Sequence, residues 1–284
     1  MTFFIPLLVE FIRKRTFYNE VNKTFEKLDK KFMLSEMINE PNFFEGDFLC
    51  EIVKGSDKAM NDEIAKYKIS TQDYKEYIEK WVHEIKTPIA ACKLAAENNK
   101  SAVSDEFCDD LDKIDRYVTQ TLFYSRISNV EKDYIIKEKS LNELVSSSLR
   151  ANSRLLIKNG FAIKRENLDY TVMTDEKWLA FILEQIISNS VKYKGENPQL
   201  TFKGISYENC TVLEISDNGM GIDKADLPRI FEKNFTGGNG RLNKKATGFG
   251  LYLCKKLCLK LGINISAKSE NGTTIILSFP MRKI

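Results

Sequence analysis

His83 is the single histidine of the chain, and Glu84 follows it directly in the segment Trp81-Val82-His83-Glu84-Ile85-Lys86-Thr87-Pro88. A neutral imidazole can attack phosphorus, and histidine is the side chain that titrates near neutral pH. Glu84 could accept the proton of the other ring nitrogen or hold the tautomer. Thr87 lies one helical turn further, where its hydroxyl could place a water against a phosphorylated ring. These residues predict a phosphate acceptor, although a lone histidine on a helix is more often an inert, solvated side chain.

A polar helix face carries Gln185, Asn189 and Lys192, which are spaced four and three residues apart. Asn189 offers an amide oxygen to Mg²⁺, a cation that prefers hard oxygen ligands, and Gln185 is a candidate second ligand. Lys192 can neutralise phosphate charge. By itself the pattern fits equally well the solvated outer face of an amphipathic helix.

The segment from Asp217 to Ile222 reads Asp-Asn-Gly-Met-Gly-Ile and follows an apolar strand. A carboxylate at the end of a strand can accept a hydrogen bond from an exocyclic amine such as that of adenine. Gly219 and Gly221 allow a sharp turn and a close approach of the backbone to a ligand. The alternative is a tight turn that needs only Asx-Gly chemistry.

A glycine-rich, basic loop covers residues 232–248, and Phe231 and Phe235 enter it. Such a loop can order over a nucleotide and exclude water. Lys233 and Arg241 are candidate phosphate contacts. A mobile surface loop is the alternative that the glycines also permit.

The segment Thr247-Gly248-Phe249-Gly250-Leu251 is expected to begin a helix that ends before Gly262. Backbone N–H groups at a helix N-terminus bind phosphate, and glycines let the phosphate come close. A glycine N-cap without a ligand is the alternative. The sequence contains neither a P-loop nor a protein-kinase signature, so the predicted nucleotide site belongs to another class.

Two helices must present His83. The first runs from about Met60 to Glu97, and apolar residues recur along it and along the next helix at coiled-coil spacing. The two seams are Ile78, Val82, Ile85, Ile89 and Cys92, then Phe107, Leu111, Ile114, Val118 and Leu122. A hairpin of this kind buries little alone, so we expect a homodimeric four-helix bundle with the His83 ring at its surface.

The remaining elements predict an α+β domain in which helices cover one face of a mixed sheet. We expect helices over 140–158, 175–193 and 247–261. The expected strands cover residues 161–166, 170–173, 199–206, 211–216, 263–268 and 273–279.

Composition sets broad limits. The 284 residues allow about two domains, and 43% hydrophobic and 29% charged residues are ordinary for a globular protein. A formal charge of +3 gives no reason to expect nucleic acid. The six cysteines lack CxxC spacing, and we expect Cys254 and Cys258 to be buried free thiols.

The N-terminus begins with an apolar stretch over residues 3–12, followed by Arg13-Lys14-Arg15. It is shorter than the about 20 residues of a membrane span, and we interpret it as the inner end of a truncated transmembrane helix, with an ordinary amphipathic helix as the alternative. A helix is expected over 7–35, broken at Glu40-Pro41-Asn42, with Gly46-Asp47 continuing the turn.

In order and spacing these motifs resemble the bacterial sensor histidine kinases of two-component systems, over roughly residues 60–280. His83 to Pro88 looks like their phosphoacceptor box, and Asn189, Asp217-Xaa-Gly219-Xaa-Gly221, Phe231…Phe235 and Gly248-Xaa-Gly250 match their ATP-binding boxes. The nucleotide-binding set that we expect comprises Asn189, Lys192, Tyr193, Asp217, Gly219, Gly221, Ile222, Lys233, Phe235, Arg241, Thr247, Gly248, Phe249, Gly250 and Leu251.

The resemblance implies a juxtamembrane part over 1–59, a dimerisation and phosphotransfer hairpin over 60–132, and a Bergerat-type ATP-binding α/β sandwich over 133–284. A narrower resemblance, carried by Arg13 to Tyr18, Tyr77 to His83 and Phe231 to Gly237, is to the intramembrane-sensing kinases of the bacitracin-resistance type. It implies ATP and Mg²⁺ as cofactors, a response-regulator partner, an antimicrobial-peptide ABC transporter, and a place at the cytoplasmic face of the membrane.

Three positions depart from the family pattern: Gln185 stands where many members have Asn, Ala246 replaces the first glycine of GxGxG, and Phe249 replaces the common Leu. Two other classes of protein also stay open, the second of them because of Gln185 and Ala246. One is an ATPase or molecular clamp that uses the same nucleotide site without His83. The other is a structural dimeric adaptor derived from a kinase.

Overall fold

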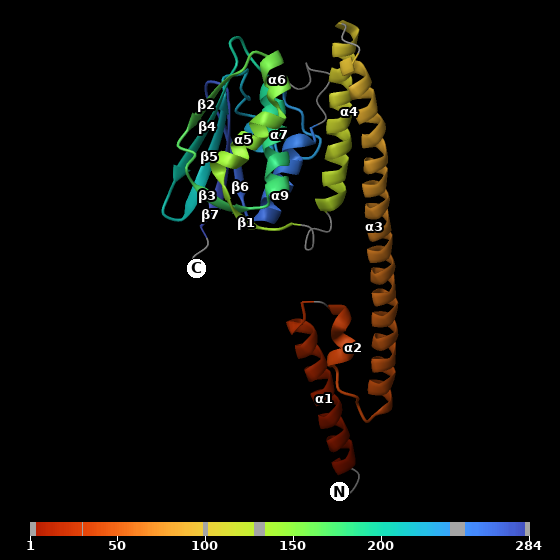
Figure 1. Ribbon diagram of the computed structural model, residues 1–284. Coiled ribbons are helices and arrows are strands. Elements are labelled where there is room, and N and C mark those ends of the chain that lie inside the picture. Colours follow the sequence, from red (N-terminus) through yellow and green to blue (C-terminus); the bar gives the residue numbers. More distant parts are fainter. Residues whose placement is uncertain (1–3, 30, 99–101, 128–133, 239–247, 282–284) are drawn as a thin grey trace. The chain divides into compact units, whose positions relative to one another are not determined.

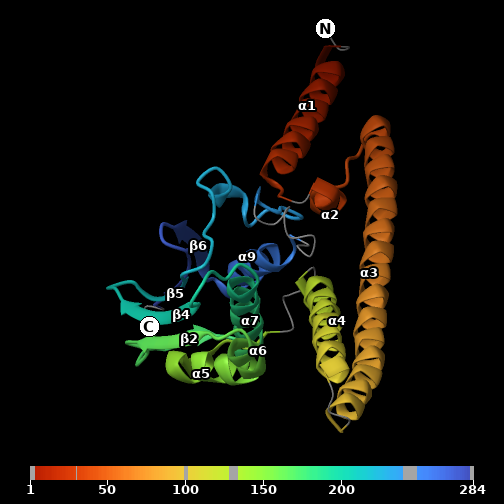
Figure 2. The same cartoon turned by 90° about the horizontal axis from the view of Figure 1, so that it is seen from above.

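The computed structural model describes residues 4–29, 31–98, 102–127, 134–238 and 248–281. The chain divides into two compact units, Met1–Lys80 and Trp81–Ile284. Figures 1 and 2 show the elements of each unit.

The first unit contains helix α1 (Phe4–Lys27), the 3-10 turn η1 (Lys31–Met33), the short helix α2 (Leu34–Met37) and the beginning of α3. The Phe17 and Phe43 rings meet edge to face, with centroids 5.4 Å apart. The Lys14 ammonium lies 2.9 Å from Glu10 and 2.8 Å from Glu45. These contacts tie α1 to the start of α3.

The helix predicted over 7–35 differs from the structure at both ends, because α1 begins at Phe4 and ends at Lys27. Phe4, Leu8 and Phe11 are more than half exposed. Within the described residues, no helix is both long and apolar enough to span a membrane.

Helix α3 (Phe44–Asn98) begins directly after the predicted break and passes through the expected boundary near residue 60 without interruption. The prediction that Gly46-Asp47 continues the turn is wrong, because both residues lie in the first turn of α3. Close packing explains why residue 46 is a glycine. A Cβ there would stand 2.7 Å from atoms of Pro41 and Phe43, which pack on the helix start. Pro88 lies within α3 and does not end it.

The end of α3 and helix α4 (Ala102–Ile127) form the predicted hairpin, and the two run side by side in both views (Figures 1 and 2). The buried seam residues are Ile78, Val82, Ile89, Leu111 and Val118, together with Ala96 and Cys108. Lys93 pairs with Asp112 at 2.8 Å across the hairpin. Cys92, Phe107 and Ile114 of the expected seam are exposed in the single chain, and their burial in a dimeric bundle stays a prediction.

The sheet of the second unit is mixed and has the order β2-β4-β5-β7-β6. Its strands are β2 (Ala162–Glu166), β4 (Gln199–Ser206), β5 (Cys210–Asp217), β6 (Asn264–Ser269) and β7 (Thr273–Pro280). β2 runs parallel to β4, and the other pairs are antiparallel. A separate antiparallel pair joins β3 (Thr171–Thr174) to β1 (Lys137–Ser140), a strand that the sequence pattern did not indicate.

Helices α5 (Leu141–Ala151), α6 (Ser153–Lys158), α7 (Glu176–Lys192) and α9 (Gly250–Leu261) lie on one face of this sheet (Figure 2). The predicted helix over 140–158 is divided at Asn152, whose side chain donates to the Ser148 carbonyl at 2.9 Å. Ser140 and Asp175 cap α5 and α7 through their side chains, as N-cap residues commonly do.

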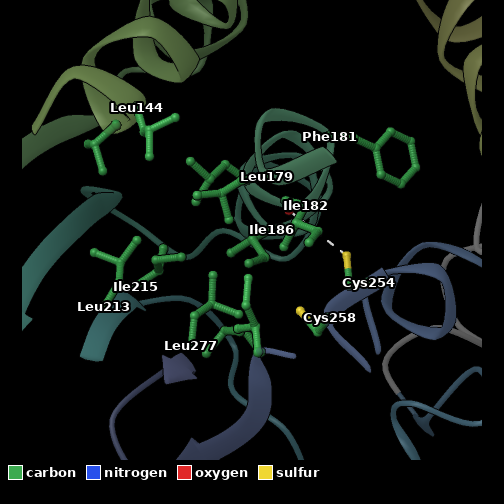
Figure 3. Packing of buried hydrophobic residues seen from close by; sticks show 14 of the residues in the cluster. Leu144, Leu179, Phe181, Ile182, Ile186, Leu213, Ile215, Cys254, Cys258 and Leu277 are labelled. Atoms are coloured by element: carbon green, nitrogen blue, oxygen red, sulfur yellow. Dashed lines mark hydrogen bonds between the residues drawn. The ribbon is translucent and has the colours of Figure 1, made fainter. Parts of the chain in front are cut away.

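The core fills the space between α7, α9 and the sheet. Figure 3 shows Ile182 and Ile186 of α7 beside Leu213, Ile215 and Leu277 of the sheet. Cys254 and Cys258 are fully buried free thiols within it, as predicted. Burial raises the pKa of Cys258 to about 12, so its thiol stays protonated at neutral pH. These observations confirm the predicted α+β class.

Candidate functional site

The candidate phosphate acceptor lies on α3 at the start of the second unit. His83 and Glu84 are exposed, and Val82 beside them is almost fully buried against the hairpin. His83 therefore lies at the surface of the hairpin, and its place at the surface of a dimeric bundle stays a prediction. The Thr87 hydroxyl donates to the His83 carbonyl at 3.3 Å, so it is anchored one turn from the imidazole that it was predicted to serve.

Asp217 ends β5, and three donors hold its carboxylate. Its Oδ1 accepts the backbone N–H groups of Gly219 at 3.0 Å and of Thr273 at 3.1 Å. Its Oδ2 accepts the Ser190 hydroxyl of α7 at 2.9 Å. A carboxylate has about four lone-pair positions, so one position on Oδ2 is left for a ligand. The arrangement suits the predicted contact with an exocyclic amine.

The neighbouring Asn218 has a structural role. Its side-chain oxygen accepts the Gln199 N–H at 2.7 Å, and its amide nitrogen donates to the Asn197 carbonyl at 3.0 Å. Both contacts fix the turn that leaves β5. The side chain of Asn218 thus holds the backbone of the turn, whereas the carboxylate of Asp217 is the charged acceptor beside it.

The predicted glycines have the geometry expected of a close-packed turn. A Cβ on Gly219 would lie 2.4 Å from the Tyr193 carbonyl, which accepts the Met220 N–H at 2.9 Å. Gly221 has φ +70°, a conformation that favours glycine. The Ile222 N–H donates to Ser269 at 2.8 Å. The turn after Asp217 therefore packs against the C-terminal end of α7 and the end of β6.

Four residues of this site were not predicted: Ser190, Ser269, Gly272 and Thr273. Gly272 has φ +105°, and a Cβ there would lie 2.0 Å from the Asp217 carbonyl oxygen. Gly272 lies between the strands expected over 263–268 and 273–279, but only the pairing of β5 with β7 brings it to Asp217. Nothing in the spacing indicated Ser190 as a partner, because 27 residues separate it from Asp217.

Asn189 and Lys192 are half-buried at the end of α7, and Tyr193 is its C-cap. Burial lowers the pKa of Lys192 below its usual value. In the described part of the chain Lys192 pairs with no carboxylate, and its ammonium lies 5.2 Å from the centre of the Tyr193 ring. A phosphate group bound beside it would stabilise the charge of this partly desolvated ammonium.

Gln185 is buried, and its side-chain oxygen accepts the Gln120 amide of α4 at 2.7 Å. One lone pair of this oxygen therefore has a protein partner. The other side of the residue borders the start of α9, because a Cβ on Gly250 would lie 3.0 Å from the same oxygen.

The side-chain oxygens near the end of α7 could supply only some of the ligands of a Mg²⁺ ion. Among the described residues, no group of three His, Cys, Asp or Glu is placed to hold a metal. Mg²⁺ commonly keeps several waters and is shared between one or two protein oxygens and the phosphates of a nucleotide. The amide oxygens of Asn189 and Gln185 are of that type, and they lie on the helix that carries Lys192.

The loop after the 3-10 turn η3 (Leu227–Arg229) places Lys233 on aromatic rings. Its ammonium lies 3.1 Å from the Tyr124 hydroxyl of α4, and the hydrogen bond to that hydroxyl raises the pKa of Lys233. The Phe249 ring is 5.6 Å from the same ammonium. The Phe235 ring is 4.4 Å from the Arg229 guanidinium. In this arrangement Lys233 is held by Tyr124, and its predicted phosphate contact stays a prediction.

Gly238 and Gly248, the described residues on either side of 239–247, make close local contacts. The Gly238 N–H donates to the Asp226 carboxylate at 2.9 Å. A Cβ on Gly248, which has φ +66°, would lie 2.5 Å from the Asn234 carbonyl carbon. The predicted helix start at Thr247 is corrected to Gly250, with Gly248 and Phe249 before it. Arg241 and Thr247 lie outside the described residues.

The sheet, the helices on one of its faces and the Asp217 turn define the class of ATPase to which the second unit belongs. Residues 174–283 match the family model of histidine kinase-, DNA gyrase B- and HSP90-like ATPases. The chain is 31% identical to the sensor protein BceS of Bacillus subtilis over 99% of this chain and 83% of that protein. It belongs to the bacterial sensor histidine kinases and is an ATP-using enzyme of that family.

Other relatives agree. The sensor histidine kinase YxdK of Bacillus subtilis is 33% identical over 72% of this chain and 64% of that protein. The sensor histidine kinase GraS of Staphylococcus haemolyticus is 29% identical over 93% of this chain and 78% of that protein. These matches confirm the resemblance to the bacitracin-resistance type of kinase.

Solved structures support the fold. Full-length ShkA, crystallised with AMPPNP, aligns with a TM-score of 0.54 and 20% identity, over 72% of this chain and 45% of that one. The histidine kinase AdeS of Acinetobacter baumannii aligns with a TM-score of 0.51 and 17% identity, over 71% of this chain and 98% of that one. At these identities the likeness concerns the fold alone.

Proposed function

We propose that this kinase transfers the γ-phosphoryl group of ATP to His83. The observation that carries the proposal is the Asp217 carboxylate, which three protein donors hold with one acceptor position left. The exposed His83 belongs to the same compact unit. A nucleotide site and a nucleophile in one unit are the two parts that autophosphorylation needs.

In this proposal each residue has a distinct task. Asp217 accepts the 6-amino group of adenine, and the glycines after it let the base approach the backbone. Lys192 balances phosphate charge, and Asn189 with Gln185 would hold Mg²⁺, which supplies charge neutralisation at the phosphates when it is bound. Positioning and electrostatics account for most of the catalysis of phosphoryl transfer.

The transfer itself forms a bond between an imidazole nitrogen and the γ-phosphorus. The bond between that phosphorus and the β,γ-bridging oxygen breaks, and ADP leaves with its electron pair. Glu84 takes up the proton of the other ring nitrogen or holds it in a hydrogen bond. The exposed position of His83 on α3 leaves its ring accessible to a nucleotide.

The partners of this kinase are proposed from its membership of the family. A sensor kinase of this family hands its phosphate to an aspartate of a response regulator, and the hairpin is the expected dimer interface. Thr87, one turn from His83, would place the water for dephosphorylation of that regulator. By similarity to BceS and GraS, we propose a role in antimicrobial-peptide or cell-envelope stress together with an ABC transporter, at the cytoplasmic face of the membrane.

The test is incubation of the 284-residue chain with γ-labelled ATP and Mg²⁺, with label on protein and free phosphate measured in parallel. Label on the protein is the expected result. Free phosphate without labelled protein would contradict the proposal and favour an ATPase or clamp. Failure to bind ATP would favour an adaptor that only contacts its partner.

A further inference from the structure

Ser190 links the two halves of the nucleotide site. It lies on α7 directly after Asn189 and two residues before Lys192, and it is 3% exposed. Its hydroxyl donates to Asp217 Oδ2 at 2.9 Å. One hydrogen bond therefore connects the helix that carries the phosphate-side residues to the carboxylate at the end of β5.

The bond decides which acceptor position a ligand can use. Asp217 Oδ1 already accepts two backbone N–H groups, those of Gly219 and Thr273. With Ser190 on Oδ2, the remaining lone pair has a fixed direction, since a carboxylate held at both oxygens cannot rotate. A buried hydroxyl that gives its single proton to Asp217 presents only lone pairs on its other side.

We propose that Ser190 is a specificity-determining positioning residue, which holds Asp217 so that the site selects a purine with a 6-amino donor. The inference rests on the proposed adenine contact of Asp217. An amino group finds an acceptor there. A base with an acceptor or a hydrogen at that position leaves the remaining acceptor position of the half-buried carboxylate unpaired, which binding sites discriminate against strongly.

The experiment measures dissociation constants of the full chain for ATP and for purine riboside triphosphate, which has hydrogen in place of the 6-amino group. Ser190→Ala should weaken ATP binding about tenfold, in the range of a lost hydrogen bond to a charged group. It should change binding of the analogue by less than about twofold, because the contact that Ser190 supports is absent there. Ser190→Cys, which nearly keeps the volume but donates weakly, should show the same pattern.

The matched control is Ser188→Ala, on the same helix and two residues earlier, which should alter neither constant. An equal loss for both nucleotides in the Ser190 variants would mean a purely structural role and would overturn the inference. Unchanged ATP binding in Ser190→Ala would also overturn it.

A parallel Asp217→Asn variant separates the two levels of the argument. Loss of ATP binding in Asp217→Asn, with unchanged binding in Ser190→Ala, refutes the role of Ser190 and leaves the adenine contact intact. Normal ATP affinity in Asp217→Asn refutes the adenine contact of the proposed function, and the inference falls with it.

Discussion

The ammonium of Lys192 lies 5.2 Å from the centre of the Tyr193 ring at the end of α7. Burial lowers the pKa of this lysine and raises that of the tyrosine. Because no carboxylate among the described residues pairs with Lys192, the folded protein carries the cost of a partly desolvated charge. We interpret this as a site prepared for a phosphate group, and the interpretation can be tested on stability and on binding.

Lys192→Met should weaken ATP binding by roughly 10- to 100-fold, the loss expected for a hydrogen bond to a charged group of about 1.5–3 kcal/mol. The melting temperature of the free protein should stay the same or rise, since the variant removes a desolvated charge. The pKa of Lys192 is lower in the folded state than its ordinary 10.5, so wild-type stability should gain as pH rises through that window. The variant should lack this gain.

Exposed Lys194, which donates to the Asn159 carbonyl at 3.3 Å, is the matched control. Titration calorimetry with ATP and thermal unfolding of Lys194→Met should give values close to wild type. A Lys192→Met protein that binds ATP normally would refute the phosphate role of Lys192.

Glu184→Gln should stabilise the free protein at neutral pH by a few degrees in melting temperature. Burial raises the pKa of Glu184 above 4.5, Arg116 and Lys86 partly oppose this, and Asp115 adds to it. The folded state therefore holds the proton to higher pH than the unfolded state, and wild-type stability should fall as pH rises from 4.5 through the raised pKa. The glutamine variant should lose this decline.

Urea unfolding at pH 5 and pH 7.5 measures this difference, with exposed Glu196→Gln as the control. The Glu184→Gln advantage should be larger at pH 7.5 than at pH 5. An advantage that is the same at both pH values would show that the carboxylate of Glu184 carries no burial penalty.

Gly272→Ala should damage the nucleotide site through the backbone. Its Cβ would lie 2.0 Å from the Asp217 carbonyl oxygen, at φ +105°. We expect the free energy of unfolding to fall by about 1–3 kcal/mol. We expect the affinity for ATP to fall by more than about tenfold. Gly160→Ala shares a positive φ of +69° but has open space around it, so it measures the conformational cost alone. Equal effects of both variants on ATP binding would contradict the close-packing argument.

The sequence was sufficient for the elements with strong local signals. Ser140 and Asp175 indicated helix starts that the structure confirms with side-chain caps. The strands expected over 199–206 and 273–279 agree with β4 and β7 to within one residue. The division at Asn152 and strand β1 were missed, because the first is a single local hydrogen bond and the second is a short, charged strand.

The candidate site was predicted where its residues are contiguous and missed where they are not. Asp217, Gly219 and Gly221 form one turn, so their spacing was informative. Ser190 and Thr273 reach Asp217 only after α7 packs on the sheet and β5 pairs with β7. Lys233 shows the converse, since tertiary packing places its ammonium on Tyr124, a contact that no local pattern could indicate.

The most direct test of the central claim is phosphorylation of His83→Gln beside wild type, with ATP affinity measured for both. Phosphohistidine is hydrolysed in acid and survives base. We predict label on wild type that acid removes and base does not, and no label on His83→Gln despite unchanged ATP binding. Label on the variant, or label on wild type that withstands acid, would contradict the assignment of His83 as the phosphate acceptor.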